Sequence, residues 1–256
     1  MNKFMKNFPG DSFVCFLTSL GLLILTGIVF LFPVGFSEFR NSDSFAPFWY
    51  YITVTGGVYG SAVIITALTV YLLNYFKKDN NKKRSVLLFT GTVLIFQILI
   101  SGSTLFYFKD VFRNPRPSQL YISEKGSSDK GANEFFTMVP EEKTKYLRKK
   151  IEENRAAFED VYPPILNSWS EESGFSFPSG HSETSFFLGT IMAFVIFKTG
   201  SKKYYVSLPV IWAVLVALSR VVIGVHYPED VVAGAFIGLV ISLIIISTKK
   251  SKLIFN

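Results

Sequence analysis

Cysteine and histidine are the scarcest reactive residues in this chain, which has one cysteine and two histidines among 256 residues. The single cysteine, Cys15, excludes an internal disulfide bond, and its position in an apolar segment gives no evidence about the redox compartment. The chain also lacks a basic soluble face interleaved with aromatic residues. Its net charge of +7 therefore does not indicate nucleic-acid binding, and we expect none.

Apolar residues, by contrast, make up 49% of the chain and are gathered into long blocks. Six blocks are long enough to span a bilayer, at residues 13–36, 52–76, 86–108, 182–197, 204–223 and 231–247. The first is too long for a signal peptide and no small-x-small cleavage site follows it, so we expect a retained helix. The blocks predict an all-α fold, a six-helix transmembrane bundle in a single domain over residues 1–256.

The distribution of lysine and arginine predicts the orientation of this bundle. Basic residues with few acidic neighbours cluster in the amino-terminal tail, after the second block, after the fourth block and in the carboxy-terminal tail. Acidic residues are concentrated in the connections on the other side. By the positive-inside rule, we expect both termini in the cytoplasm and the connection between the third and fourth blocks outside it.

That connection, residues 118–177, is the one sizeable soluble segment, and we expect it to form a partly helical, extracytoplasmic insert. Residues 126–131 are typical of a flexible turn. Pro140, followed by two glutamates, predicts the start of a helix, and Pro163-Pro164 predicts its end. The apolar stripe on this helix is expected to pack onto the membrane domain; it consists of Leu147, Ile151 and Phe158.

Three polar segments adjoin apolar blocks on the expected outer side. In the first, Lys109 closes the third block, and Arg116 follows between two prolines that break the helix and hold the arginine in an extended segment. An ammonium beside a fixed guanidinium can clamp an oxyanion. Arg113 would lie beside Lys109 on one helical face and is not assigned to the clamp. The alternative is an ordinary juxtamembrane basic cluster.

The second segment is Pro178-Ser179-Gly180-His181, at the start of the fourth block. Free backbone N–H groups and the helix dipole make such a helix start a cradle for an anion. Ser179 can cap the helix or bind a phosphate oxygen, and Ser179 as a nucleophile is a minor alternative. A further alternative is a plain helix start that carries an interfacial histidine.

The third segment combines Arg220, near the outer end of the fifth block, with His226 and Asp230. A cation inside an apolar block is expensive, so we expect it to be functional or paired with an acid. Pro228 predicts the first turn of the sixth helix. Asp230 is then within reach of one nitrogen of His226, and the other nitrogen is free to attack. A His/Asp metal pair is the rival interpretation, and it would need further ligands that the sequence does not identify.

Cations that bind an oxyanion, one imidazole that attacks and a second that protonates the leaving group are what metal-free phosphate-ester cleavage requires. The combined pattern resembles the type 2 phosphatidic-acid phosphatase superfamily: Lys, six residues, Arg-Pro; then Pro-Ser-Gly-His; then Ser-Arg, five residues, His, three residues, Asp. Every fixed position is matched, by Lys109, Arg116, Pro117, Pro178, Ser179, Gly180, His181, Ser219, Arg220, His226 and Asp230.

This resemblance implies roles for the matched residues. His226 would be the nucleophile that forms a phosphohistidine, Asp230 would orient it, and His181 would be the general acid. The phosphate would be bound by Lys109, Arg116, Ser179, Gly180 and Arg220. No metal and no other cofactor is implied. A non-enzymatic membrane transporter that uses Arg220 and the histidines as an ion path is the remote alternative.

The insert and the stretch from Trp169 to Phe177 resemble, within the superfamily, the bacterial phosphatidylglycerophosphatase B branch. That branch implies an enzyme of the bacterial cytoplasmic (inner) membrane whose active site faces the periplasm. Its expected partners are lipid phosphate substrates: phosphatidylglycerol phosphate, undecaprenyl diphosphate and phosphatidic acid. Outer-leaflet lipid A phosphatases of the same superfamily are the alternative, and the six blocks argue against its soluble vanadium haloperoxidases. Neither the physiological lipid nor the oligomeric state follows from the sequence.

Overall fold

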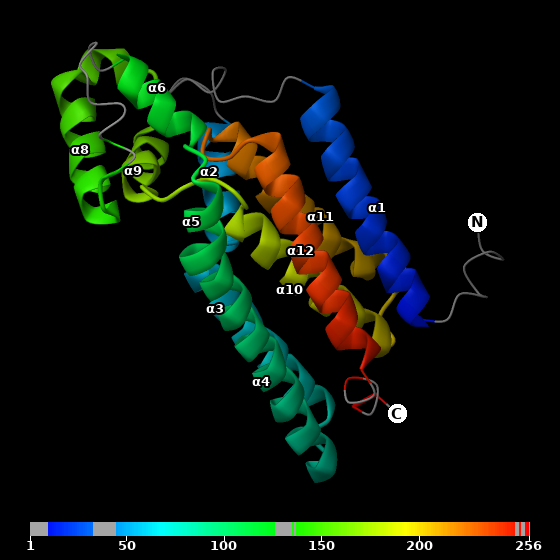
Figure 1. The fold of residues 1–256 in the computed structure, drawn as a ribbon. Coiled ribbons are helices and arrows are strands. Elements are labelled where there is room, and N and C mark those ends of the chain that lie inside the picture. The colour runs from blue at the N-terminus through cyan, green and yellow to red at the C-terminus, as the bar shows by residue number, and fades with distance from the viewer. Residues whose placement is uncertain are drawn as a thin grey trace.

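The computed structural model of the protein describes residues 10–32, 45–125, 135, 137–248, 251 and 254–255. These residues form a bundle of long helices with a group of shorter helices across one end (Figure 1). The helices are α1 (Gly10–Leu31), α2 (Ala46–Thr55), α3 (Val58–Tyr75), α4 (Asn80–Ser103), α5 (Lys109–Phe112), α6 (Pro117–Lys125), α8 (Pro140–Glu153), α9 (Pro163–Glu171), α10 (Gly180–Lys198), α11 (Lys203–Val222) and α12 (Pro228–Ser247). Over the described residues the prediction of an all-α fold is confirmed.

Five helices in the described part of the chain are long and apolar enough to cross a membrane. They are Ser12–Leu31, Val58–Tyr75, Asn80–Phe112, Tyr204–Val222 and Pro228–Ser247. The expected fourth span, α10, opens with a polar run from His181 to Ser185. Most of α10 is buried, and it packs against α1, α4, α11 and α12. Its surface therefore meets other helices and needs less apolar character than a lipid-facing helix does.

The second expected block, residues 52–76, is wrong in its boundaries because it consists of two helices. Gly56 and Gly57 separate α2 from α3. A Cβ atom on Gly56 would lie 2.3 Å from a methyl carbon of Val216 on α11, so only glycine lets the break approach that helix. Hydropathy does not locate the break because apolar residues lie on both sides of it.

The third expected block ends later than predicted, at Phe112 instead of residue 108. It includes one π-helical turn, Thr104–Phe108, after which the N–H of Lys109 donates to the carbonyl oxygen of Thr104, five residues earlier. This wider turn keeps Lys109 on the same face of the helix as Thr104. The helix stops at Arg113, whose φ of 47° is left-handed and whose N–H still donates to the Lys109 carbonyl oxygen at 3.0 Å.

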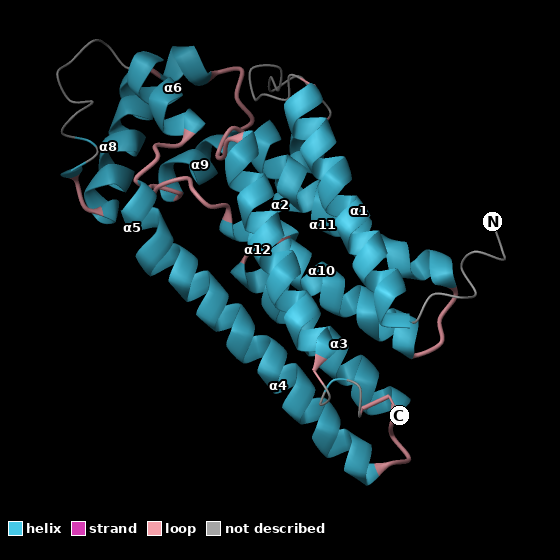
Figure 2. Cartoon of the chain, turned by 45° about the vertical axis from the view of Figure 1, so that its right-hand side comes forward, coloured by secondary structure: helices cyan, strands magenta, loops and turns pink. Residues whose placement is uncertain are grey.

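The described part of the insert folds as α6, α8 and α9 at one end of the bundle (Figure 2). Pro163 begins α9, so the prediction that it ends the preceding helix is wrong, since α8 already stops at Glu153. Proline suits a first helical turn, where no intrahelical hydrogen bond is lost. The apolar stripe packs as expected, in a core that joins insert residues such as Trp169 to Ile223 of the α11–α12 turn. The expected turn at residues 126–131 lies outside the described residues.

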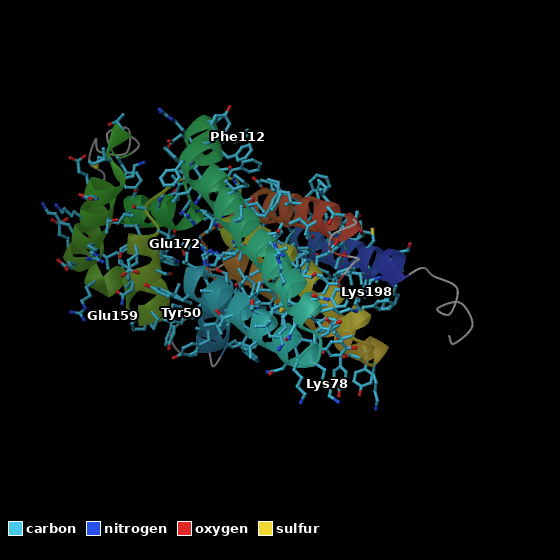
Figure 3. All side chains as sticks on the ribbon, turned by 90° about the horizontal axis from the view of Figure 1, so that it is seen from below. Tyr50, Lys78, Phe112, Glu159, Glu172 and Lys198 are labelled. Carbon is cyan, nitrogen blue, oxygen red and sulfur yellow. The ribbon has the colours of Figure 1, made fainter. Side chains whose placement is uncertain are left out.

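Acidic side chains gather in the insert, whereas the opposite end of the bundle is basic and has few of them. Lys78 and Lys198 lie at the end away from the insert, whereas Glu159 and Glu172 belong to the insert itself (Figure 3). The connections α3–α4 and α10–α11, which the sequence predicts to be cytoplasmic, therefore share one end of the bundle. The three polar segments share the other end, beside the insert.

Candidate active site

Arg116, in the first polar segment, is fixed by both its backbone and its guanidinium. Its backbone N–H donates to Oε1 of Gln119, in the first turn of α6, at 3.1 Å. The buried guanidinium donates from Nε to the Gly174 carbonyl oxygen and from Nη1 to the Val225 carbonyl oxygen, both at 2.9 Å. The insert and the α11–α12 turn thus set the direction of this side chain.

The second segment is held in place by the first turns of α12. Ser179 caps α10, with its hydroxyl oxygen accepting from the N–H and the hydroxyl of Ser182. The N–H of Ser179 donates to the Asp230 carbonyl oxygen at 3.0 Å. This contact requires glycine at position 234, because a Cβ atom on Gly234 would lie 2.3 Å from the Ser179 carbonyl oxygen. His181 follows in the first turn of α10.

The third segment folds into a tight turn between α11 and α12. The N–H of His226 donates to the Arg220 carbonyl oxygen at 3.1 Å. Pro228 begins α12, as predicted, and Asp230 lies in its first turn. Oδ2 of Asp230 accepts from the Tyr227 N–H at 2.9 Å and lies 3.3 Å from Nδ1 of His226. The expected contact between His226 and Asp230 is confirmed.

Each ring nitrogen of His226 has a neighbour that fixes its protonation. Nε2 lies 3.1 Å from Nη1 of Arg116, and a guanidinium can only donate, so Nε2 is the acceptor. The proton then sits on Nδ1 and faces Asp230. Burial lowers the pKa of His226 well below its ordinary value, and the nearby Arg116 and Arg220 lower it further. A neutral imidazole with an unprotonated Nε2 can attack an electrophile once that nitrogen is released from the Arg116 N–H.

Glu172 lies at the centre of this cluster, although none of the three polar segments contains it. Its Oε2 lies 2.9 Å from Nη1 of Arg116 and accepts a hydrogen bond from Nη2 of Arg220. Burial would raise the pKa of this carboxyl, but Arg220 and Arg116 outweigh burial and hold it well below its usual range. The one signal in the sequence is Arg220, which needs an acidic partner inside an apolar block.

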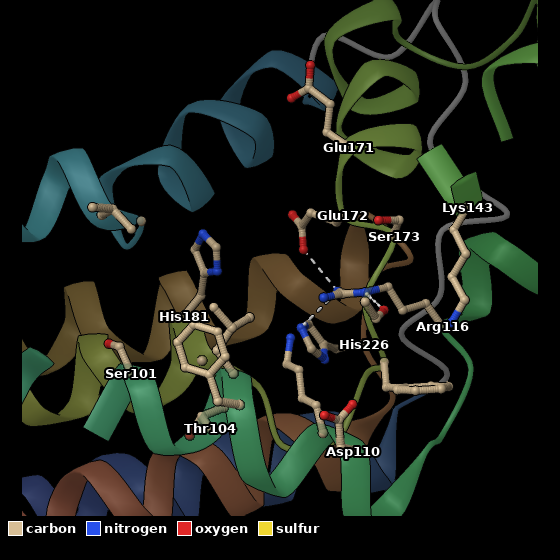
Figure 4. Close-up of a pocket in the computed structure, with 18 of the residues that line it drawn as sticks. Ser101, Thr104, Asp110, Arg116, Lys143, Glu171, Glu172, Ser173, His181 and His226 are labelled. Carbon is tan, nitrogen blue, oxygen red and sulfur yellow. Dashed lines mark hydrogen bonds and ion pairs between the residues drawn. The ribbon is translucent and has the colours of Figure 1, made fainter. Parts of the chain in front are cut away.

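A cavity of about 950 Å³ opens beside these groups (Figure 4). Its polar part is lined by Lys109, Arg116, Glu172, Gly180, His181 and His226. Another wall comes from α3, α4 and the π-helical turn, with side chains that include Val58, Ser61, Gln97 and Leu105. Three further predicted site residues are buried next to the lining: Ser179, Arg220 and Asp230. A phosphate-sized anion and an apolar chain can therefore share one cavity.

The structure thus brings all eight predicted site residues to one end of the bundle, and their chemical roles stay predictions. Among the described residues, no group of three or more His, Cys, Asp and Glu side chains is placed to hold a metal ion. The carboxylate at Nδ1 of His226 is instead a hydrogen-bonding partner of the ring.

Membrane-spanning helices that bring an imidazole and several cations to one cavity fit a class of protein, the membrane phosphatases. The chain belongs to the PAP2 superfamily, whose family model matches residues 87–253. The family resemblance seen in the motifs is confirmed.

Individual proteins similar to this chain carry related names. Phosphatidylglycerophosphatase B of Haemophilus influenzae is 27% identical over 91% of this chain and 95% of that protein. The protein of the same name from Escherichia coli is 27% identical over 57% of this chain and 54% of that protein. Lipid A 4'-phosphatase of Bacteroides thetaiotaomicron is 42% identical, over 25% of this chain and 27% of that protein.

Proposed function

We propose that this chain is a membrane lipid phosphatase that hydrolyses phosphate monoesters or diphosphates of lipids through a phosphohistidine on His226. The observation that carries the proposal is the setting of this ring, with Nδ1 3.3 Å from Asp230 and Nε2 3.1 Å from Arg116 at the cavity wall. The printed names of the relatives, phosphatidylglycerophosphatase B and lipid A 4'-phosphatase, support the same class.

The proposed reaction has two steps. In the first, Nε2 of His226 attacks phosphorus, the bond between phosphorus and the leaving oxygen breaks, and His181 gives that oxygen a proton. Asp230 stabilises the positive charge that develops on the attacking ring. In the second step, water attacks the phosphohistidine, His181 takes a proton from the water, and inorganic phosphate leaves. Neither step needs a metal ion or another cofactor.

The phosphate oxygens would be bound by donors from four elements. The charge that builds up on them in the transition state favours fixed cations and backbone N–H groups in a dry site. The proposed donors are Lys109, Arg116, Arg220, and the start of α10 at Ser179 and Gly180. Arg116 and Arg220 suit this role because a guanidinium can hold two oxygens at once.

The proposed topology has six spans in one domain over residues 1–256, with α10 as the span that lipids do not surround. Both termini would lie in the cytoplasm of a bacterium, and residues 118–177 would form a periplasmic insert over the active site. The basic connections at the opposite end of the bundle support this orientation in the inner membrane. Oligomeric state does not enter the proposal.

The candidate substrates are phosphatidylglycerol phosphate, undecaprenyl diphosphate and phosphatidic acid. The apolar side chains in the cavity wall support a lipid, among them Val58 of α3 and Leu105 and Phe106 of the π-helical turn, because its chains could remain between membrane helices while the phosphate reaches His226. A lipid A phosphatase is the second candidate, favoured by the short but more identical match to the lipid A 4'-phosphatase.

The proposal is tested by phosphate release from these lipids and lipid A with detergent-solubilised protein. We expect turnover in the wild type, its loss in His226→Ala, and a slowed first step in His181→Ala. Orthovanadate, which mimics five-coordinate phosphorus, should inhibit, and EDTA should not. Absence of release from every lipid would refute the phosphatase assignment. Activity lost in EDTA and regained with a divalent ion would refute the metal-free mechanism.

A further inference from the structure

The two arginines proposed to bind phosphate already have an anion between them. Oε2 of Glu172 lies 2.9 Å from Nη1 of Arg116, and the same oxygen accepts a hydrogen bond from Nη2 of Arg220. We refer to Arg116 and Arg220 as the arginine pair. A carboxylate and a phosphate present similar oxygens to guanidinium groups, so the two compete for the same donors. Figure 4 shows the Glu172 carboxylate reaching toward Arg116 in the cavity that His181 and His226 also line.

Other hydrogen bonds of the arginine pair go to neutral groups of the protein and do not compete with phosphate. Arg220 donates from Nη1 to the Thr53 hydroxyl at 2.8 Å, and Arg116 donates from Nε to the Gly174 carbonyl oxygen. The bonds to Glu172 are the ones made to a charged group that lines the cavity. A phosphate that entered while Glu172 stayed would place two anions side by side in a poorly solvated space, where like charges repel strongly.

Glu172 is also the member of this cluster that can move. Its side chain is 24% exposed, whereas those of Arg116 and Arg220 are 4% and 1% exposed. Its backbone is anchored, because its N–H donates to the Ser168 carbonyl oxygen at the end of α9. Rotation of the side chain alone would therefore carry the carboxylate from the arginine pair toward the open part of the cavity, without unfolding the insert.

We propose that Glu172 is a displaceable ligand of the arginine pair, which it holds in the empty enzyme and releases when a phosphate group enters. The proposal rests on the proposed function. It makes Glu172 a residue that sets how tightly any phosphate group binds, because every incoming phosphate must replace its charge-assisted contacts with the arginine pair. A lipid phosphate also gains from the binding of its apolar chains, so it can remain bound despite that cost, whereas free inorganic phosphate has no such gain. Glu172 would thus lower the affinity for the product and ease its release, while the ratio of the two affinities stays set by the lipid chains.

The test compares Glu172→Gln with Glu171→Gln. Glu171 is a suitable control because it lines the same cavity, is exposed, and pairs with Arg148 on the surface. The dissociation constant of inorganic phosphate is measured by calorimetry on detergent-solubilised protein. We expect Glu172→Gln to bind phosphate at least about tenfold more tightly than the wild type, because the competing charge is gone. Glu171→Gln should bind phosphate with a dissociation constant within about twofold of the wild type. This control shows that loss of one negative charge near the cavity does not by itself tighten phosphate binding.

A purely structural role for Glu172 predicts the opposite result. If Glu172 only aligned the arginine pair, Glu172→Gln would bind phosphate more weakly or equally, and either outcome would overturn the proposal. Glu172→Ala supplies an independent measurement, since added acetate should weaken phosphate binding in this variant more than in the wild type. Equal sensitivity to acetate in both proteins would also count against displacement.

The outcome is separable from that of the proposed function. A wild type that hydrolyses no lipid phosphate refutes the phosphatase assignment, whatever the phosphate-binding constants are. An active wild type in which Glu172→Gln binds phosphate no more tightly refutes the displaceable ligand and leaves the phosphatase assignment in place.

Discussion

At the scale of single residues, the two histidines of the cavity are held in different ways. His226 has a defined partner at each nitrogen, Arg116 at Nε2 and Asp230 at Nδ1. The ring of His181 lies beside the α2–α3 break, where a Cβ atom on Gly57 would come within 3.3 Å of its Nε2. The spacing of His226 and Asp230 could be read from the sequence because both lie at one helix start. Gly57 and Glu172 could not, because their neighbours come from elements distant in the chain.

Asp230→Asn tests the orienting role at this scale. The amide keeps a hydrogen-bond acceptor but loses the charge that stabilises His226 as it attacks, so we expect kcat to fall at least about a hundredfold, or about 2.7 kcal/mol in the barrier. Glu229→Gln is the matched control, because Glu229 is an exposed neighbour in the same turn, and it should leave kcat unchanged. A fall in kcat of less than about threefold for Asp230→Asn would contradict the role.

The protonation of His226 can be observed directly because the chain has only two histidines. In His181→Gln protein with ¹⁵N-labelled histidine, one imidazole remains visible by NMR. Its lowered pKa keeps the ring neutral as the pH falls through the ordinary value of about 6.5, so at about pH 6 we expect a neutral ring with its proton on Nδ1.

The neighbouring cation supplies the control for that measurement. Removing the charge of Arg116 by Arg116→Gln should raise the pKa of His226, because this guanidinium opposes a second proton on the ring. A doubly protonated ring at about pH 6 in the parent protein would contradict the expected direction.

At the scale of elements, polar and apolar patterns predict well where a helix begins and poorly how helices meet. Ser179 and Pro228 mark the starts of α10 and α12 in the sequence and in the structure. Pro163 also marks a helix start, yet the sequence interpretation assigned it to a helix end because proline suits both. The insert could not be folded from sequence alone, because its core includes Ile223 from a distant turn.

Gly234→Ala tests the contact between α12 and the start of α10. The new Cβ atom would lie 2.3 Å from the Ser179 carbonyl oxygen, so one backbone must shift and His181 must shift with it. We expect a loss of stability of about 1–3 kcal/mol and a fall in kcat/KM of at least about tenfold. The measurements are the thermal midpoint in detergent and phosphate release. Gly91→Ala on α4 is the control, because in the described part of the chain its new Cβ would meet no atom within 4 Å beyond its own stretch of helix, and normal activity is expected there.

At the scale of the whole molecule, the distribution of charge and the directions of the helices indicate the same two ends of the bundle. The basic connections lie at one end, and the cavity and the insert lie at the other (Figure 1 and Figure 3). Length and composition identify five spanning helices in the described part of the chain, and α10, which the sequence predicts to be a sixth, does not meet this criterion and is enclosed by its neighbours. Hydropathy therefore predicts lipid-facing helices more reliably than central ones.

Cysteine labelling tests the orientation in intact cells. In a Cys15→Ser background, Lys149→Cys places a thiol on an exposed position of α8, and Asn80→Cys places one at the start of α4. A membrane-impermeant maleimide should label the first in intact cells and the second only after permeabilisation. The reverse pattern would place the active site in the cytoplasm.

The π-helical turn at Thr104–Phe108 has a consequence for how this protein tolerates change in length. This turn contains one residue more than an ordinary helical turn. It therefore shifts by one residue the register between α4 and the turn that carries Lys109. Loss of one residue within the π-helical turn would leave an ordinary helical turn in which Lys109 still lies one turn after Thr104, whereas loss of one residue elsewhere in α4 would rotate Lys109 by about 100° relative to the preceding helix, even though every motif residue would survive. What has to be kept is therefore the direction in which Lys109 points from the helix axis. The family motif begins at Lys109, so it contains no information about that direction.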